Sequence, residues 1–264
     1  MDVRKQPLRI AVAVLWLALL PIAARAQDLR VAAASDLQAA LPALVLRFEK
    51  QYGQRVAVTY GSSGNFFAQI QNGAPFDLFL SADIDYPRRL EQQGLTERGT
   101  LTRYAVGRLV LWTRKDSGID LRQGLAALVN PKIRRIAVAN PDHAPYGRAA
   151  VAALRAAQIY DRVRDRFVFG ENISQAAQFA QSGNADVGII ARSLVGGPAL
   201  RSGVFVEVPA SLHPPIEQGA VVLRSARNAT AARQFISFLE SAESVEHLNG
   251  SGFAAPTVRT NGGR

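Results

Sequence analysis

Short apolar runs alternate with helical patterns along most of this chain. Residues 29–34 form an apolar run of the length of a buried strand, and apolar side chains then recur at spacings of three and four from Leu37 to Phe48. That spacing predicts an amphipathic helix that ends near Gly53, and Pro42 is expected to bend it. Further strands are expected at residues 56–60, 76–80, 108–112, 135–139, 167–169, 185–190 and 220–223, and further helices at 65–72, 148–157, 174–181 and after Asn228. This alternation predicts an α/β protein with mainly parallel sheets.

The turns from strand to helix carry the candidate chemistry. Three of them, at 34–36, 62–65 and 146–147, hold small, hydroxyl or glycine residues, and a fourth at 171–173 has Asn172 as a candidate N-cap. A helix start leaves its first N–H groups unpaired and carries a partial positive charge. Several starts that meet outside the strand ends would form a pocket of hydrogen-bond donors, which suits an anion. For Ser35 or Ser63 alone, capping of its own helix is the competing interpretation.

The composition excludes several classes of protein. The 264 residues are 48% apolar and 20% charged, include 21 Gly and 13 Pro, and contain no cysteine. A chain of this length buries a core large enough to fold without a metal or a disulfide, as one domain or as two lobes. Without cysteine there is no thiol nucleophile, iron–sulfur cluster, thiolate zinc site or lipid anchor, and the three histidines lie far apart in the sequence. We therefore expect no cofactor and no metal-cation site.

The first 26 residues have the pattern of a secretory signal peptide. Basic residues at positions 4, 5 and 9 precede the apolar stretch 10–22, and Ala24-Arg25-Ala26 supplies the small residues that a signal peptidase accepts. The apolar stretch is short for a membrane span, although an N-terminal anchor is the alternative. Cleavage before Gln27 would remove four cations and one anion and change the net charge from +10 to +7. The mature chain is then expected to be a soluble protein of a bacterial periplasm.

The remaining positive charge is spread over the chain. The basic groups at 88–89, 134–135 and 162–166 are short, separated and interleaved with acidic residues. A nucleic-acid site needs a basic stripe with aromatic residues among the cations, and none is present. We therefore expect no nucleic-acid partner, although a positive surface steers anions toward the protein.

Residues that could indicate an enzyme have plainer interpretations. Ser35 and Ser63 lie outside any Gly-x-Ser-x-Gly motif and lack assignable His and Asp partners. Asp77 and Asp83 flank a strand, and turn or cap roles are favoured for them because an unpaired carboxylate would repel an anion. His143 is expected at a loop surface rather than against a ligand, because a neutral imidazole donates a single hydrogen bond.

Four segments resemble the molybdate-binding proteins that serve ABC importers. They are LRVAAASDL at 29–37, GSSGN at 61–65, GAPFDLFLSAD at 73–83 and ANPDHAPYGRAA at 139–150. Each segment is short, but their combination in this order is specific to that family. The resemblance covers nearly the whole mature chain and extends through 187–190 to Gly252-Phe253.

The resemblance implies a type II periplasmic binding protein of two lobes, each a mainly parallel sheet flanked by helices. Residues 1–26 would be the signal peptide, 27–107 plus 219–264 the first lobe, and 108–218 the second, with a hinge of two crossing segments near 104–108 and 216–220. The implied function is that of a monomeric, non-enzymatic receptor in the periplasm. It would capture molybdate, and also tungstate, and deliver the oxyanion to an ABC permease in the inner membrane.

Carried over residue by residue, the resemblance implies four oxyanion-binding positions. The serine that ends the first strand matches Ser35, and the serine of the second turn matches Ser63. Tyr146 and Ile173 match the positions that donate backbone N–H groups at two helix starts. In some members a tyrosine at a later strand end also binds the anion, but this chain has Ala191 at that position. We hypothesise that the hydroxyl of Tyr146 replaces the missing donor.

The chemistry of such a site narrows the choice of anion. A pocket of hydroxyls and N–H groups favours a fully ionised oxyanion, because a protonated phosphate would bury its own O–H group without an acceptor. Cavity size must then separate molybdate from sulfate. A sulfate or thiosulfate receptor is therefore the alternative function, and an exported enzyme on the same scaffold is a second alternative.

Overall fold

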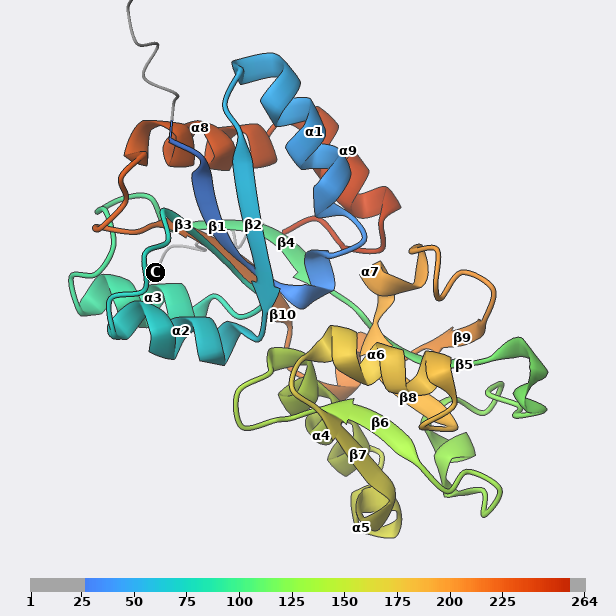
Figure 1. Ribbon diagram of the computed structural model, residues 1–264. Coiled ribbons are helices and arrows are strands. Elements are labelled where there is room, and N and C mark those ends of the chain that lie inside the picture. Colours follow the sequence, from blue (N-terminus) through green and yellow to red (C-terminus); the bar gives the residue numbers. More distant parts are fainter. Residues whose placement is uncertain (1–26, 257–264) are drawn as a thin grey trace, which may run out of the picture.

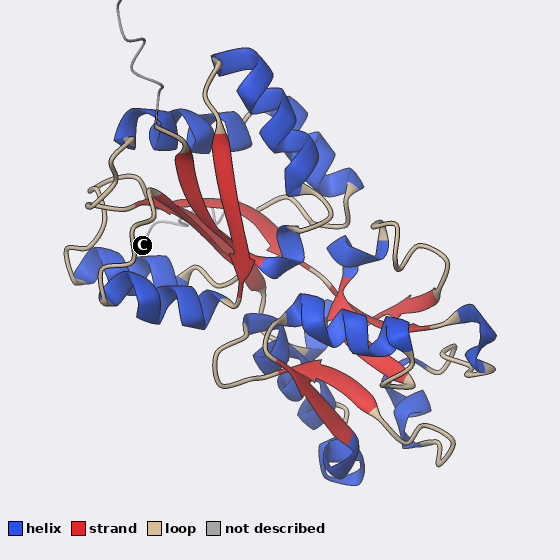
Figure 2. Cartoon of the chain, viewed as in Figure 1, coloured by secondary structure: helices blue, strands red, loops and turns tan. Residues whose placement is uncertain are grey.

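The computed structural model describes residues 27–256, which form two β-sheets with helices on their faces (Figure 1, Figure 2). Each sheet has five strands and packs around its own large hydrophobic cluster. The predicted α/β fold of two lobes is therefore confirmed. The predicted signal peptide at 1–26 and the tail at 257–264 lie outside the described residues. Within residues 27–256, every helix is too short or too polar to cross a bilayer.

The first sheet is built from strands β1 (Leu29–Ala34), β2 (Val56–Gly61), β3 (Leu78–Ser81), β4 (Thr102–Gly107) and β10 (Ile216–Val222). Their order is β2-β1-β3-β10-β4, with β2, β1 and β3 parallel and β10 antiparallel to both of its neighbours. One face is covered by helices α1 (Leu41–Tyr52), α8 (Ala229–Leu239) and α9 (Ala242–Gly250), and the other by α2 (Ser63–Gln71) and α3 (Asp85–Gln92) (Figure 1).

The second sheet is built from β5 (Leu109–Thr113), β6 (Ile136–Ala139), β7 (Phe167–Gly170), β8 (Val187–Ala191) and β9 (Val204–Glu207). Their order is β7-β6-β8-β5-β9, with β7, β6 and β8 parallel and β5 antiparallel to β8 and β9. Helix α4 (Pro145–Ala156) and helix α6 (Ile173–Ser182) pack on opposite faces of this sheet (Figure 1), and α5 (Tyr160–Val163) and α7 (Arg192–Val195) are single turns. Short 3-10 helices occupy Ser35–Leu37, Lys115–Ser117, Gly124–Val129, Arg164–Arg166 and Ala210–Leu212.

The sheets are mixed rather than parallel throughout, because each contains one strand, β10 or β5, that runs opposite to the other four. The apolar pattern missed one edge strand in each sheet, β4 and β9, and also helices α3 and α9. Strand β9 lies at a sheet edge with none of its residues buried, and the sequence of α3, DYPRRLEQ, has only three buried residues. An element that buries few side chains needs few apolar residues, so its sequence carries little periodic pattern. Contacts with distant parts of the chain then determine its structure.

Three helix boundaries differ from the predicted ones. Residues 35–37 form a separate 3-10 turn, so α1 begins at Leu41 and Pro42 lies in its first turn. The predicted bend at Pro42 is therefore wrong. Residues in the first turn donate no hydrogen bond within the helix, so a proline there interrupts none. Gly53 ends α1 with a φ of 66°, as expected for a left-handed C-cap. Helices α2 and α4 begin two and three residues earlier than predicted, which places Ser63 and Tyr146 inside first turns.

Two segments connect the sheets. Strand β4 continues through Arg108 directly into β5, and β10 returns the chain to the first sheet. Ile216 pairs with Gly107, so β10 already belongs to the first sheet at its first residue. The first connection falls within the predicted hinge segment 104–108, whereas the second lies just before the predicted segment 216–220. The division into 27–107 plus 219–264 and 108–218 stays a prediction, and for brevity we refer to the parts on either side of these connections as lobe one and lobe two.

A buried carboxylate fastens the start of the first sheet. Asp77 is fully buried and accepts hydrogen bonds from the backbone N–H groups of Arg30 at 2.8 Å, Arg227 at 2.7 Å and Asn228 at 3.4 Å. Its side chain therefore joins β1 to the turn that precedes α8. This geometry supports the structural interpretation of Asp77 over a catalytic one.

We expect Asp77→Ala to lower the free energy of unfolding by about 3 kcal/mol or more, because the substitution leaves several buried N–H groups without an acceptor. Asp77→Asn keeps one acceptor oxygen and should lose less. Urea unfolding followed by circular dichroism measures both. A loss below about 1 kcal/mol in Asp77→Ala would show that the carboxylate does not hold the sheet together.

Candidate functional site

The four predicted site residues line one small cavity between the two lobes. Ser35 and Ser63 follow strands β1 and β2 of lobe one, while Tyr146 and Ile173 follow β6 and β7 of lobe two. Each is at most 4% exposed, and the space open to the centre of a water-sized sphere among the lining residues is only about 10 Å³. The other lining residues are Ala34, Asp36, Gly61, Ser62, Ala82, Ala144, Pro145 and Asn172. The cavity thus lies where the carboxyl ends of four parallel strands face one another.

Three helices begin at this cavity. Ser63 is the first residue of α2, Tyr146 the second of α4 and Ile173 the first of α6. Their N–H groups belong to first turns and have no acceptor within the helix, and the helix dipoles add partial positive charge there. Asn172 caps α6 as predicted, since its side chain accepts a hydrogen bond from the Gln175 N–H at 3.0 Å. The cavity is therefore surrounded by backbone donors.

The hydroxyl oxygens of Ser35 and Ser63 each accept a hydrogen bond from a backbone N–H group, which leaves the hydroxyl protons available for donation. The Oγ of Ser63 accepts a hydrogen bond from the Ala82 N–H at 2.9 Å, and the Oγ of Ser35 accepts one from the Ser174 N–H at 3.4 Å. Neither serine makes a side-chain cap to its own helix, so that competing interpretation is wrong. A hydroxyl that already accepts from an N–H still has its own proton to donate. Both serines can therefore donate to an acceptor in the cavity.

Tyr146 contributes differently from the prediction. Its hydroxyl donates to Oδ2 of Asp36 at 2.9 Å and lies against Gly107 and Gln218, at the connection between the sheets. This contact does not favour the hypothesis that the hydroxyl binds the anion, which stays a prediction, because the structure directs the hydroxyl to a carboxylate. Its backbone N–H, in the first turn of α4, stays a candidate donor. Ala191 ends β8 without a polar side chain, as predicted, and is absent from the cavity lining.

Asp36 is the site residue that the sequence analysis missed. It is fully buried and lines the cavity, and burial raises the pKa of its carboxyl group to about 7 despite hydrogen bonds from Tyr146 and from backbone N–H groups. Burial, together with the nearby Asp36, also raises the pKa of Tyr104 and Tyr146 well above the ordinary value. Oδ1 of Asp36 has no hydrogen-bond partner. The only signal in the sequence was its position beside Ser35, and a carboxylate next to an anion site looked unfavourable.

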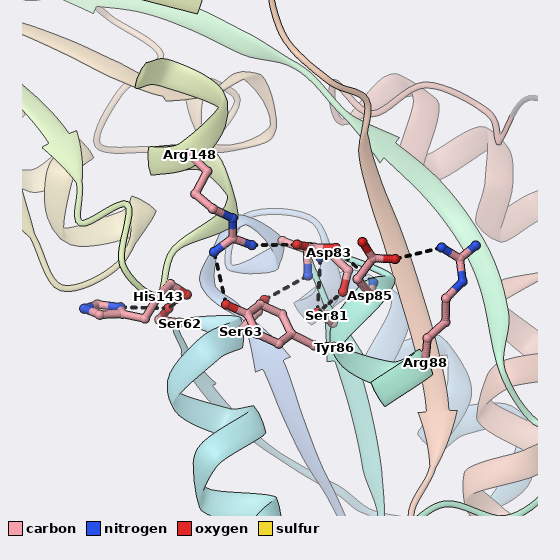
Figure 3. A network of polar contacts seen from close by, with 10 residues as sticks. Ser62, Ser63, Ser81, Asp83, Asp85, Tyr86, Arg88, His143 and Arg148 are labelled. Carbon is pink, nitrogen blue, oxygen red and sulfur yellow. Dashed lines mark hydrogen bonds and ion pairs between the residues drawn. The ribbon is translucent and has the colours of Figure 1, made fainter. Parts of the chain in front are cut away.

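Contacts between the lobes surround the cavity. The carbonyl oxygen of His143 accepts from the Gly64 N–H at 2.9 Å and from the Ser62 hydroxyl at 2.6 Å (Figure 3). A Cβ at Gly64 would lie 2.6 Å from that carbonyl oxygen, so the close approach requires glycine. His143 packs between the lobes rather than lining the cavity, and its Nδ1 lies 3.1 Å from the Ser62 Oγ. These contacts belong to a closed arrangement of the lobes.

The cavity lining within the described chain contains no lysine or arginine. Its candidate donors are the serine hydroxyls and the N–H groups at helix starts, which bind anions without a countercharge, and Asp36 supplies the one carboxyl group among the described lining residues. Across residues 27–256, no three His, Cys, Asp or Glu side chains lie close enough together to hold a metal ion. The site can therefore surround a small acceptor-rich anion with donors.

Comparisons with known proteins agree with this geometry. Residues 29–254 match the family model for bacterial extracellular solute-binding proteins. The chain is 38% identical to the molybdate-binding protein ModA of Azotobacter vinelandii over 89% of this chain and 93% of that protein. It is 36% identical to ModA of Rhodobacter capsulatus over 78% of this chain and 80% of that protein. The solved Azotobacter vinelandii periplasmic molybdate-binding protein superimposes with a TM-score of 0.82 at 35% identity, covering 87% of this chain and all of that one.

Asp36 makes the stability of the protein depend on pH. Its pKa is raised from the ordinary 3.8 to about 7 in the folded state, so the folded protein binds the proton more tightly than the unfolded chain. The resulting stability is fully present below pH 4 and is lost as the pH rises to 7. One pKa unit corresponds to about 1.4 kcal/mol, so the loss is of order 4 kcal/mol.

Asp36→Asn keeps an acceptor for Tyr146 and removes this titration. We expect the variant to be more stable than the wild type at pH 7.5, with the difference shrinking toward pH 4. Urea unfolding at several pH values measures this, with Asp165→Asn, whose side chain is 92% exposed, as the control. Parallel pH profiles for the wild type and Asp36→Asn would contradict the assignment.

Proposed function

Because the chain belongs to the family of bacterial extracellular solute-binding proteins, we propose that it captures molybdate between its lobes for delivery to an ABC permease. The observation that carries this proposal is the meeting of four strand-to-helix turns at one cavity lined by donors. The relatives named as molybdate-binding proteins support the choice of ligand. Ser35, Ser63, Tyr146 and Ile173 are the proposed ligand residues, with Tyr146 and Ile173 acting through their N–H groups.

The donor set suits a tetrahedral dianion. Each oxygen of molybdate is an acceptor, and two hydroxyls with three or more N–H groups can satisfy them at once without any cation. Tungstate has the same charge and shape, so we propose that it binds to the same groups. Sulfate also has this chemistry but is smaller, and its rejection must come from the distance between the two sets of donors.

One feature favours a second candidate ligand. Oδ1 of Asp36 is a buried acceptor without a partner, and it could accept the proton of a hydrogen phosphate ion. Against this, an ionised Asp36 repels any dianion, and the identity to molybdate-binding relatives favours molybdate. Phosphate is therefore tested beside sulfate.

The place of action follows from the family. We propose that residues 1–26 direct export and are removed, and that the mature protein acts as a monomer in the periplasm. The family is described as extracellular and the related Azotobacter vinelandii protein is periplasmic, and both support this location. We further propose that the protein binds its ligand without chemical change, since the cavity offers donors but no paired acid and base.

Molybdate and tungstate should raise the melting temperature, while equimolar sulfate or phosphate should not. A ligand that binds only the folded state stabilises it by about 4 kcal/mol at a thousandfold excess over its Kd, which corresponds to a shift of several degrees. Differential scanning fluorimetry measures all four anions in parallel. Equal shifts for sulfate and molybdate would refute selection by size, and a larger shift with phosphate would favour the second candidate.

Ser35→Ala and Ser63→Ala should each raise the Kd for molybdate about tenfold to a hundredfold, because each deletes a hydrogen bond to a charged ligand. Titration calorimetry measures the change. Ser182→Ala is the matched control, since Ser182 is exposed at the far end of α6 and bonds only the Phe179 carbonyl. Unchanged affinity in both cavity variants would exclude the hydroxyls as ligand groups.

A further inference from the structure

A charged side chain joins the two lobes at the rim of the cavity. Arg148 lies on α4 two residues after Tyr146, and its Nη2 is 2.6 Å from Oδ2 of Asp83 in lobe one (Figure 3). Its Nη1 donates to the hydroxyl of Tyr86 at 3.1 Å, and the guanidinium group lies 5.4 Å from the centre of that ring. Arg148 therefore contacts lobe one through two different groups.

The carboxylate of Asp83, which accepts from Arg148, is oriented by hydrogen bonds within lobe one. Asp83 lies in the turn between β3 and α3, where its backbone carbonyl accepts from the Ser81 hydroxyl at 2.7 Å. Its other carboxylate oxygen, Oδ1, accepts from the Asp85 N–H at 2.9 Å. Oδ2 is thus left for Arg148, and the pair needs little further ordering to form. The remaining ion pairs of residues 27–256 join groups within one lobe, along strands β4 and β10, or at the connecting residue Arg108.

We propose that Arg148 is a latch residue that sets how long the anion stays bound. Its bonds to Asp83 and Tyr86 hold the lobes closed over the cavity and break when the lobes separate. Arg148 is thus a positioning residue, since it acts on the bound anion through closure and does not line the cavity. The choice of anion in this proposal rests on the proposed function, but the latch itself does not.

The position of the latch explains why it would control release. Ala82 and Pro145 line the cavity, and they lie close in sequence to the two latch partners, Asp83 and Arg148. Opening the cleft at this rim separates α4 from the β3–α3 turn and so must break the latch. An anion enters the open form, in which the latch is not yet made. The latch should therefore lower the dissociation rate, and its loss can affect association only by raising the fraction of open molecules.

The test compares this pair with an ion pair of the same surface that stays within one lobe. Arg88 and Asp85 lie on α3, only a few residues from Asp83, with an Nη1 to Oδ1 distance of 2.8 Å (Figure 3). Release of radioactive molybdate into excess unlabelled molybdate gives the dissociation rate. We expect release about threefold to tenfold faster in Arg148→Gln and Asp83→Asn, and wild-type release in Arg88→Gln.

A double variant of Arg148 and Asp83 shows whether the two side chains act as a pair or affect release independently. If the two side chains act as a pair, Arg148→Gln with Asp83→Asn should release molybdate no faster than the more affected single variant. Association rates should not fall in any of them, because loss of the latch can only increase the fraction of open molecules. A release rate in Arg148→Gln equal to that of Arg88→Gln would overturn the latch.

A measurement without ligand keeps the latch testable if molybdate fails to bind. The chain has no cysteine, so Leu46→Cys and Phe169→Cys, at exposed positions on α1 and β7, accept a donor and acceptor dye. Energy transfer then reports the fraction of closed molecules. Arg148→Gln should lower this fraction relative to Arg88→Gln, and identical distributions would refute the latch. Absence of molybdate binding by the wild type would refute the proposed function alone.

Discussion

Unpaired backbone N–H groups at facing helix starts are the constraint on which the rest of this structure depends. Three helices begin at one cavity, where burial removes the water that would otherwise satisfy their first N–H groups. Such a cavity is costly to close when empty and favourable to close around an anion that accepts from all of them. The two lobes each supply part of the donor set, so ligand binding and closure become one process.

The polar contacts around the cavity follow from that requirement. Asp36 and Tyr146 meet beneath it, and Arg148 meets Asp83 at its rim. Both pairs join the lobes, yet they differ in character. The first is buried at the connection between the sheets, where burial raises the pKa of the Asp36 carboxyl group to about 7. The second is half exposed and lies where the cleft would open, so it affects the lifetime of the closed form rather than its chemistry.

Local patterns in the sequence were sufficient for the fold class and for identifying the four strand-to-helix turns that the structure brings to one cavity. The apolar run at 29–34 and the hydroxyl residues that follow it predicted both a strand and a donor turn, because each depends on residues adjacent in the chain. The direction of the Tyr146 hydroxyl depends on Asp36, which is 110 positions away in sequence. Strand β9 and helix α3 bury too few apolar residues to leave a pattern. What the sequence could not show was therefore long-range packing.

The claim that these helix starts hold a molybdate ion is tested most directly by crystals grown with molybdate. Diffraction data collected on either side of the molybdenum absorption edge locate the metal atom independently of the protein atoms. The account predicts a single anomalous peak among Ser35, Ser63 and the first turns of α4 and α6. A peak at the surface arginines 134–135, or none inside the cavity at saturating ligand, would contradict it.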